Sequence, residues 1–142
     1  MKLIEGKVAI VTGSGRGIGR AVAELFAQHG ARVVVNDLNA DVAEEAAEAI
    51  RKTGAEAVAV AGSVTDPQFP NTLIKSTVDR FKALDIIVNN AGYTYDGVIQ
   101  KMDDEQWYAM IAAISPAPSA SCARRRSTGE IGRSRSRPRG SG

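Results

Sequence analysis

The sequence predicts an α/β domain built on a doubly wound parallel sheet. Three observations support this prediction: continuous apolar runs of strand length, longer segments with apolar residues at helical spacing, and glycines that follow those segments. Strands that alternate with helices along a chain form a parallel sheet through right-handed crossovers. We therefore expect the order β-α-β-α-β-α-β-α over residues 1–114.

The first two strands flank a glycine-rich turn and one helix. Residues 8–11 form a continuous apolar run, typical of a strand that is buried on both faces. Apolar residues at helical spacing then predict a helix that ends at Gly30, and residues 32–37 form the second strand. We expect the buried stripe of this helix to consist of Ile18, Ala21, Val22, Leu25 and Phe26.

The second helix has a start signal and a stop signal. Asp41 and Glu44 have the spacing of a capping box, and Gly54 follows the last turn. Residues 57–61 read as the third strand. The apolar side of this helix is expected to contain Val42, Ala46, Ala49 and Ile50.

The third helix is expected to begin after a cap at Thr65, with a start that Pro70 delays. Residues 84–88 form the fourth strand, and the acidic residues from Asp103 onward begin a fourth helix. The apolar stripe of the third helix contains Leu73, Ile74, Val78 and Phe81.

Composition and charge divide the chain at residue 114. Residues 1–114 contain 11 basic and 15 acidic side chains, a net charge of −4. Residues 115–142 contain seven Arg, seven Ser, four Gly and three Pro, and their net charge is +6. Such a segment buries too little apolar surface to offset its ordering entropy, so we predict a disordered basic tail. GC-rich codons read out of frame give this bias, and we interpret the tail as an out-of-frame product.

Length and composition exclude several classes of protein. The 142 residues suffice for one ordinary domain, and 44% hydrophobic with 24% charged residues is globular composition. The only cysteine, Cys122, excludes an intramolecular disulfide. No apolar run approaches the ~18 residues of a membrane span, and no leader is visible. We expect a cytoplasmic protein without a metal site.

The turn after the first strand has the properties of a phosphate-binding turn. Residues 12–19 read Thr-Gly-Ser-Gly-Arg-Gly-Ile-Gly and lie between a predicted strand and a predicted helix. Glycines allow a tight turn, expose backbone N–H groups and leave room for phosphates at the helix N-terminus. The spacing is T-G-x-x-x-G-x-G rather than the generic G-x-G-x-x-G.

A second motif makes the resemblance to a family specific. Residues 89–92 read Asn-Asn-Ala-Gly directly after the fourth strand. Together with the glycine turn, this pattern resembles the short-chain dehydrogenase/reductase family, in particular reductases of the 3-oxoacyl-acyl-carrier-protein type, over about residues 3–112. The resemblance implies a Rossmann-type fold with strand order 3-2-1-4, truncated after four βα units. It also implies an unpaired edge at the fourth strand, and full-length members that are usually homo-oligomers.

The resemblance implies roles for individual residues. A buried amide that bridges strands is the simplest interpretation of Asn89. Ser63 and Val64 follow the third strand near the expected adenine position, where the family commonly has an Asp. The implied cofactor-binding residues are Gly13, Ser14, Arg16, Gly17, Ile18 and Gly19 in the turn, Asp37, Ser63 and Val64, and then Asn89, Ala91 and Gly92.

Two residues give opposite indications about the nucleotide. Asp37 ends the second strand, where a carboxylate accepts hydrogen bonds from the adenosine ribose and repels a 2′-phosphate. This favours NAD. Arg16, a basic residue in the glycine turn, resembles the NADP-binding subset and leaves NADP as the alternative.

The catalytic residues of the family are absent from this sequence. Members use a Ser and a Tyr-x-x-x-Lys, with Tyr as the general acid/base. The three tyrosines here have no Lys four residues later, and the last lysine is Lys101. The resemblance therefore implies the NAD(P)-binding portion of an oxidoreductase for a carbonyl/secondary-alcohol pair, inactive alone and with no catalytic residue of its own. Two alternatives stay open: a non-catalytic nucleotide-binding or regulatory fragment, and nucleic-acid binding through the basic tail.

Overall fold

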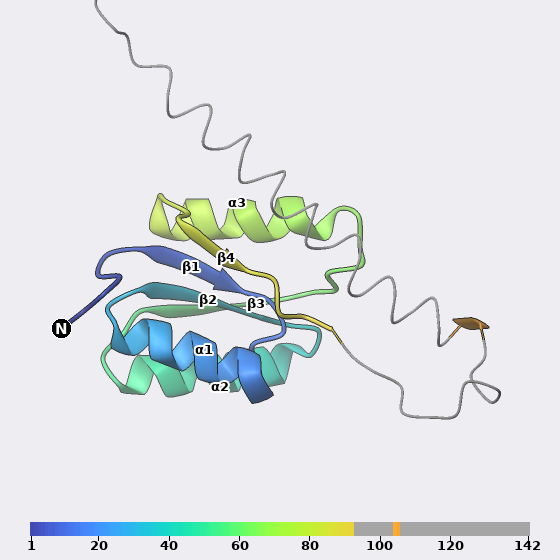
Figure 1. Ribbon diagram of the computed structural model, residues 1–142. Helices are drawn as coiled ribbons and strands as arrows, with labels where there is room; N and C mark the ends of the chain where they lie inside the picture. Colours follow the sequence, from blue (N-terminus) through green and yellow to red (C-terminus); the bar gives the residue numbers. More distant parts are fainter. Residues whose placement is uncertain (93–103, 106–142) are drawn as a thin grey trace, which may run out of the picture.

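The computed structural model describes residues 1–92 and 104–105, and the predicted alternation of strands and helices is confirmed through the fourth strand (Figure 1). Of the predicted fourth helix, residues 104–105 are described, and they are helical. The predicted boundary at residue 114 and the predicted tail lie outside the described residues. The elements are β1 (Val8–Val11), α1 (Gly17–Gln28), β2 (Arg32–Asp37), α2 (Ala40–Lys52), β3 (Ala57–Ala61), α3 (Phe69–Phe81) and β4 (Ile86–Val88).

The four strands form one parallel sheet in the expected order β3-β2-β1-β4. Val11 at the end of β1 lies beside Val35 of β2 and Val88 of β4. All four strands run in the same direction, so their carboxyl ends meet at one edge of the sheet (Figure 1). In open parallel sheets, ligands bind outside this edge.

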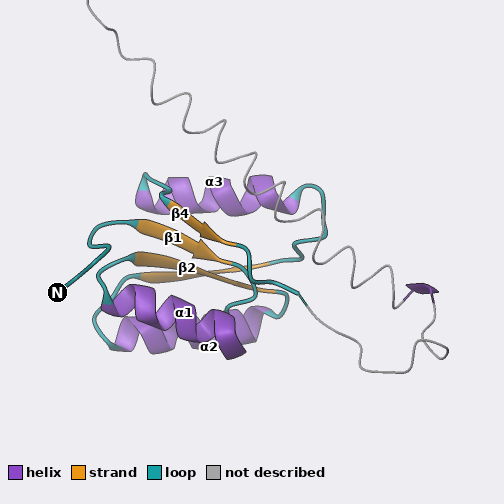
Figure 2. Ribbon diagram, in the orientation of Figure 1, coloured by secondary structure: helices purple, strands orange, loops and turns teal. Residues whose placement is uncertain are grey.

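Helices cover both faces of the sheet (Figure 2). Helices α1 and α2 lie on one face, where Val11, Val33 and Val35 pack against small residues of the two helices. Helix α3 lies on the other face, where Phe69, Leu73 and Phe81 pack against Val8, Ile10 and Val34. Strand β1 is fully buried because its alternate side chains enter both cores.

The buried face of α1 differs from the predicted stripe. Ile18 is 79% exposed and Leu25 is 50% exposed. Val22 and Phe26 are half-buried, as expected for the margin of the interface. The buried residues of α1 are instead Gly19, Ala23 and Ala27, of which Ala23 and Ala27 pack in the core with β1 and β2. Small residues let the helix approach the sheet closely, so the largest apolar side chains do not mark the contact.

The start of α2 also differs from the prediction. Asn39 is the N-cap, and its Oδ1 accepts hydrogen bonds from the N–H groups of Asp41 (3.0 Å) and Val42 (3.3 Å). Asp41 lies in the first turn, where its charge suits the helix dipole. Asn39 is as good a capping residue as Asp, so sequence preference alone did not separate the two positions.

Helix α3 begins at Phe69, after the predicted cap at Thr65. Pro70 is in the first turn, where its missing N–H removes no helical hydrogen bond. The predicted stripe is confirmed at Leu73, Ile74 and Phe81, which are buried.

Within the described ranges, no helix combines the length and apolar character needed to span a membrane.

Candidate functional site

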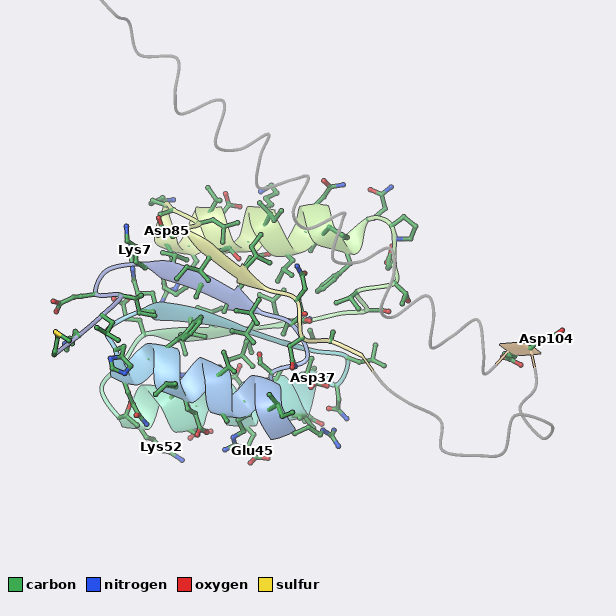
Figure 3. All side chains as sticks on the ribbon, viewed as in Figure 1. Lys7, Asp37, Glu45, Lys52, Asp85 and Asp104 are labelled. Atoms are coloured by element: carbon green, nitrogen blue, oxygen red, sulfur yellow. The ribbon has the colours of Figure 1, made fainter. Side chains whose placement is uncertain are left out.

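The glycine turn lies at the carboxyl edge of the sheet, between β1 and α1. Figure 3 shows Asp37 at this edge, whereas Lys7 and Asp85 lie at the opposite edge. Hydrogen bonds join Gly13 and Ser14 to Asn36 at the end of β2. Gly13 and Gly19 lie against Asn90, which follows β4. This arrangement follows from the fold, because β1 is hydrogen-bonded to β2 on one side and to β4 on the other.

Ser14 and Asn36 fasten the turn to β2. The Ser14 N–H donates to the Asn36 carbonyl (2.7 Å), and the Asn36 N–H donates to Ser14 Oγ (3.2 Å). The Ser14 hydroxyl in turn donates to the Val11 carbonyl (2.6 Å). Both residues are almost fully buried, so these hydrogen bonds satisfy polar groups that water does not reach.

The side chain of Asn36 continues this link to β3. Its Nδ2 donates to the carbonyls of Val60 (3.0 Å) and Gly62 (3.2 Å), and its Oδ1 accepts from the Gly13 N–H (3.4 Å). Asn36 therefore connects the turn, the end of β2 and the end of β3. Sequence reasoning missed this residue. The available signal was a polar side chain at a position that continues the buried run 33–35.

Asp37 lies beside the turn and is held by backbone donors. Its Oδ2 accepts a hydrogen bond from the Gly15 N–H (3.2 Å), and its Oδ1 accepts one from the Asn39 N–H (3.2 Å). Its main-chain carbonyl accepts from the Gly62 N–H (3.0 Å). The carboxylate is thus oriented between the glycine turn and the start of α2.

Asn90 and Thr12 join the turn to the end of β4. Asn90 Nδ2 donates to the carbonyls of Thr12 and Gly13, each at 3.1 Å. The Thr12 hydroxyl oxygen accepts the backbone N–H groups of Asn90 (3.1 Å) and Ala91 (3.0 Å) and lies 3.4 Å from the Val88 carbonyl, to which it donates. Asn89, which was expected to be a buried amide, is exposed. The amide that fastens the turn to the end of β4 is that of Asn90.

Two glycines of the turn are required by its geometry. Gly13 has φ +61°, and a Cβ there would lie 2.8 Å from Ala91 Cα. A Cβ at Gly19 would collide with Asn90 Nδ2 and the Gly13 carbonyl oxygen. At Gly13 and Gly19, therefore, the glycine turn and α1 pack against each other and the 90–91 segment without room for a side chain.

The N-terminus of α1 is the open part of the site. Arg16, Gly17 and Ile18 are exposed, and a Cβ added to Gly17 would meet no neighbouring group within 4 Å. The first N–H groups of a helix have no partner within the helix, and the first turn of α1 contains no acidic side chain. No acidic residue of the helix itself offsets the dipole here, so an anion would be favoured.

Of the remaining predicted residues, Ser63 and Val64 are half-buried beyond the end of β3. The Ser63 hydroxyl is 2.7 Å from the Thr65 hydroxyl. Gly62, directly before Ser63, is fixed to β2 by its hydrogen bonds with Asp37 and Asn36. Gly92 is exposed at the end of the described segment.

Charge beside the site is organised by Arg20, in the first turns of α1. Its Nε donates to Glu24 (2.9 Å) and its Nη1 donates to Glu45 of α2 (3.3 Å). The hydrogen bonds with Glu24 and then Glu45 raise the pKa of the Arg20 guanidinium. Through its ion pairs with Glu24 and Glu45, Arg20 links α1 to α2.

A separate cleft of about 370 Å³ lies near the opposite edge of the sheet. Its lining includes Gly30, Arg32, Gly54 and Glu56, which precede or begin β2 and β3, together with Lys2. It shares no residue with the predicted site.

In the described residues, no group of three or more His, Cys, Asp or Glu side chains is placed to hold a metal ion.

Comparison with known proteins gives a consistent assignment. The model of the short chain dehydrogenase family matches residues 7–118. The hydroxyacyl-CoA dehydrogenase ChsB1 of Mycobacterium tuberculosis is 46% identical over 114 residues, which cover 77% of this chain and 36% of that protein. The 3-oxoacyl-[acyl-carrier-protein] reductase of Synechocystis is 42% identical over 112 residues, which cover 78% of this chain and 45% of that protein.

Solved structures agree. A short chain dehydrogenase from Mycobacterium avium superposes with a TM-score of 0.84 at 38% identity, covering 93% of this chain and 51% of that chain. The chain thus spans less than half the length of these two curated relatives and about half of the solved structure. On the evidence of the matched sequence and the common fold, the chain belongs to the short-chain dehydrogenase family.

Proposed function

We propose that this chain is the nucleotide-binding portion of an oxidoreductase that acts on a carbonyl/secondary-alcohol pair, and that its preferred nucleotide is NAD. The observation that carries the proposal is the position of Asp37 against the glycine turn, next to the open N-terminus of α1. The names of the relatives, a hydroxyacyl-CoA dehydrogenase and a 3-oxoacyl reductase, support the reaction class.

The α1 N-terminus fits a pyrophosphate group. The N–H groups of Gly13, Ser14 and Gly15 are occupied by Asn36 and Asp37, so they hold the shape of the turn. The N–H groups of residues 17–19 begin the helix and have no partner within it. Glycine at positions 17 and 19 allows close approach of phosphate oxygens. Ile18 then lies beside the bound pyrophosphate.

Asp37 fits an adenosine ribose without a 2′-phosphate. A carboxylate accepts hydrogen bonds from ribose hydroxyls and repels a second negative charge at the 2′ position. Arg16 is the opposing feature, because its exposed cation can pair with a phosphate. Asp37 is fixed by two backbone donors, whereas no ion pair or hydrogen bond of the Arg16 side chain is found among the described residues, so the fixed charge prevails.

The remaining site residues receive supporting roles. Ser63 and Val64 flank the adenine, and Asn89, Ala91 and Gly92 line the path toward the nicotinamide. Bound NAD would supply the hydride-accepting ring. This sequence contains no Tyr-x-x-x-Lys to move the matching proton, so we propose that the chain alone is inactive. A non-catalytic nucleotide-binding role is the alternative. Both roles predict no turnover by this chain, so the DNA sequence after codon 112 separates them: a Tyr-x-x-x-Lys in an adjacent reading frame supports the oxidoreductase.

We also propose that residues 1–114 are a partial domain followed by a tail translated out of frame. The support is the composition change at residue 115. The DNA sequence after codon 112 tests it directly: an adjacent reading frame should encode Tyr-x-x-x-Lys within about the next hundred codons. A frame without that motif would refute the frameshift.

Calorimetric titration of the full chain with NAD and with NADP tests the nucleotide assignment. We expect NAD to bind more tightly. Asp37→Ala should lower the ratio of the NADP Kd to the NAD Kd about tenfold, equivalent to about 1.4 kcal/mol, because one charge no longer opposes the 2′-phosphate. Tighter binding of NADP by the unchanged protein would overturn the assignment to NAD.

Asp79→Ala is the matched control. It also removes one negative charge, but Asp79 lies on α3 and is 2.7 Å from Lys75, on the other face of the sheet. If net charge alone set the preference, both variants would shift it equally. We expect the control to leave the NAD-to-NADP ratio unchanged.

A further inference from the structure

Gly15 is packed against the carboxylate that we assign to ribose recognition. It is buried, and its N–H donates to Asp37 Oδ2. A Cβ built on Gly15 would lie 2.6 Å from Asp37 Oδ2 and 2.5 Å from Val42 Cγ1. Protein Cβ atoms essentially never make contacts below 3.0 Å, so any side chain at position 15 forces its neighbours to move.

The space around Gly15, and not its backbone conformation, is what calls for glycine. The described glycines with positive φ include Gly13 and Gly17 but not Gly15. Alanine can therefore adopt the backbone of residue 15 without left-handed strain. A substitution here perturbs the neighbouring side chains and leaves the path of the turn intact.

Asp37 is the neighbour that moves most easily. Its carboxylate is the end of a short side chain with two rotatable bonds, whereas Val42 is a β-branched residue with one preferred rotamer in a helix. A displaced carboxylate would lose the Gly15 N–H but keep the Asn39 N–H on Oδ1. It would therefore turn away from the glycine turn, toward the start of α2.

We propose that Gly15 is a specificity-determining residue that acts by positioning Asp37. Because position 15 has no side chain, the Asp37 carboxylate stays against the turn, where it meets the ribose hydroxyls and opposes a 2′-phosphate. This inference rests on the proposed NAD-binding function. It goes further by assigning the nucleotide preference to a pair of residues, one of which makes no side-chain contact with any ligand.

A double-mutant cycle tests the inference, with Kd measured for both NAD and NADP. Gly15→Ala should reduce the NAD preference about tenfold, mainly by weakening NAD, with NADP unchanged or tighter. General damage to the turn would weaken both nucleotides, so the ratio distinguishes the two effects. In the Asp37→Ala background, Gly15→Ala should change the ratio no further, because the group through which it acts is gone.

A second variant separates the effect of the collision with Asp37 from the effect of the collision with Val42. It also relieves one of the two collisions that could disturb folding. Val42→Ala removes the other colliding atom, so Gly15→Ala/Val42→Ala needs only the carboxylate to move. The loss of preference should persist in this double variant. If the preference instead returns to that of the unchanged protein, the effect travels through Val42 and the inference fails.

The outcomes also separate this inference from the proposed function. If the unchanged chain binds neither nucleotide, both are refuted. If the unchanged chain prefers NAD and Gly15→Ala keeps that preference, the proposed function stands and the role of Gly15 is refuted. If Gly15→Ala changes the ratio equally with and without the Asp37 carboxylate, Gly15 does not act through Asp37.

Discussion

Thr12 and Asn90 are joined by two hydrogen bonds, and Asn90 is the donor in both. The Thr12 hydroxyl oxygen accepts the Asn90 N–H at 3.1 Å, and Asn90 Nδ2 donates to the Thr12 carbonyl at 3.1 Å. Thr12 begins the glycine turn and Asn90 follows β4, so this pair fixes the turn to the edge strand of the sheet. The turn is held from the other side by Ser14 and Asn36.

Replacing Thr12 by Val tests the hydroxyl. Val has nearly the same shape, but it leaves the N–H groups of Asn90 and Ala91 without their acceptor. Because Thr12 is 2% exposed, we expect a loss of about 1–3 kcal/mol in the free energy of unfolding, measured by urea denaturation. We also expect weaker NAD binding, because the turn loses the hydrogen bonds of its hydroxyl to the end of β4 and to the two residues Asn90 and Ala91.

Thr77→Val is the matched control for this prediction. Thr77 is 1% exposed, but its hydroxyl donates only within α3, to the Leu73 carbonyl at 2.7 Å. That carbonyl keeps its helical partner after the substitution. The control should therefore cost less stability and leave NAD affinity unchanged. Equal effects at both positions would contradict a special role for Thr12.

A negative charge at position 90 should destabilise the protein more than loss of the Asn90 side chain. Asn90→Ala removes two donors and leaves the carbonyls of Thr12 and Gly13 without them. Asn90→Asp keeps the size but directs carboxylate oxygens at the same carbonyls, 3.1 Å from the original nitrogen. We expect Asp to destabilise more than Ala, because a charged group without a partner costs more than a lost hydrogen bond. Unfolding in urea gives the order, and the reverse order would contradict the donor role.

Arg20 provides a test of the link between α1 and α2. Arg20→Ala removes both ion pairs, and we expect a loss of less than about 1 kcal/mol, because the partners are partly exposed and screened by solvent. The loss should shrink further in about 1 M salt. The measurement is urea unfolding at two ionic strengths. A loss that salt does not change would mean that packing of the Arg20 stem, rather than its charge, is responsible.

The chain alone should not transfer hydride at an enzymatic rate. General acid–base help alone contributes roughly 10²–10⁴ in rate, and this sequence contains no Tyr-x-x-x-Lys to provide it. Oxidation of NADH and NADPH with a panel of carbonyl substrates gives the turnover, and the full-length reductase of Synechocystis serves as a positive control. Turnover above about 1 per second, an ordinary enzyme rate, would contradict the prediction.

The order of the elements could be predicted from the sequence because it depends on local signals. The buried runs 8–11 and 33–35, and the glycines at positions 30 and 54, mark strands and helix ends by composition alone. Both glycines have positive φ, as the prediction of helix termination required. The strand order followed from the family resemblance and is confirmed.

The contacts that hold the site could not be predicted in the same way. Nothing in the Asn89-Asn90 pair indicates which amide is hydrogen-bonded to the turn, because that depends on how the chain passes Thr12 after β4. In α1, Ala23 and Ala27 pack against the sheet, since close packing selects small side chains over large ones such as Leu25. The space at Gly15 likewise depends on α2 and β2, which follow it in the chain.

The hydrogen bonds between Thr12 and Asn90 span 78 positions of sequence, whereas those between Ser14 and Asn36 span 22. Ribosomes add about 5–20 residues per second, so the turn acquires its β2 support several seconds before its β4 support during synthesis. Each long loop must also be closed against chain entropy before its contacts stabilise the product. The rate at which β4 docks beside β1 therefore sets when the turn becomes rigid, and variants at Thr12 or Asn90 should slow folding only if that docking is part of the transition state.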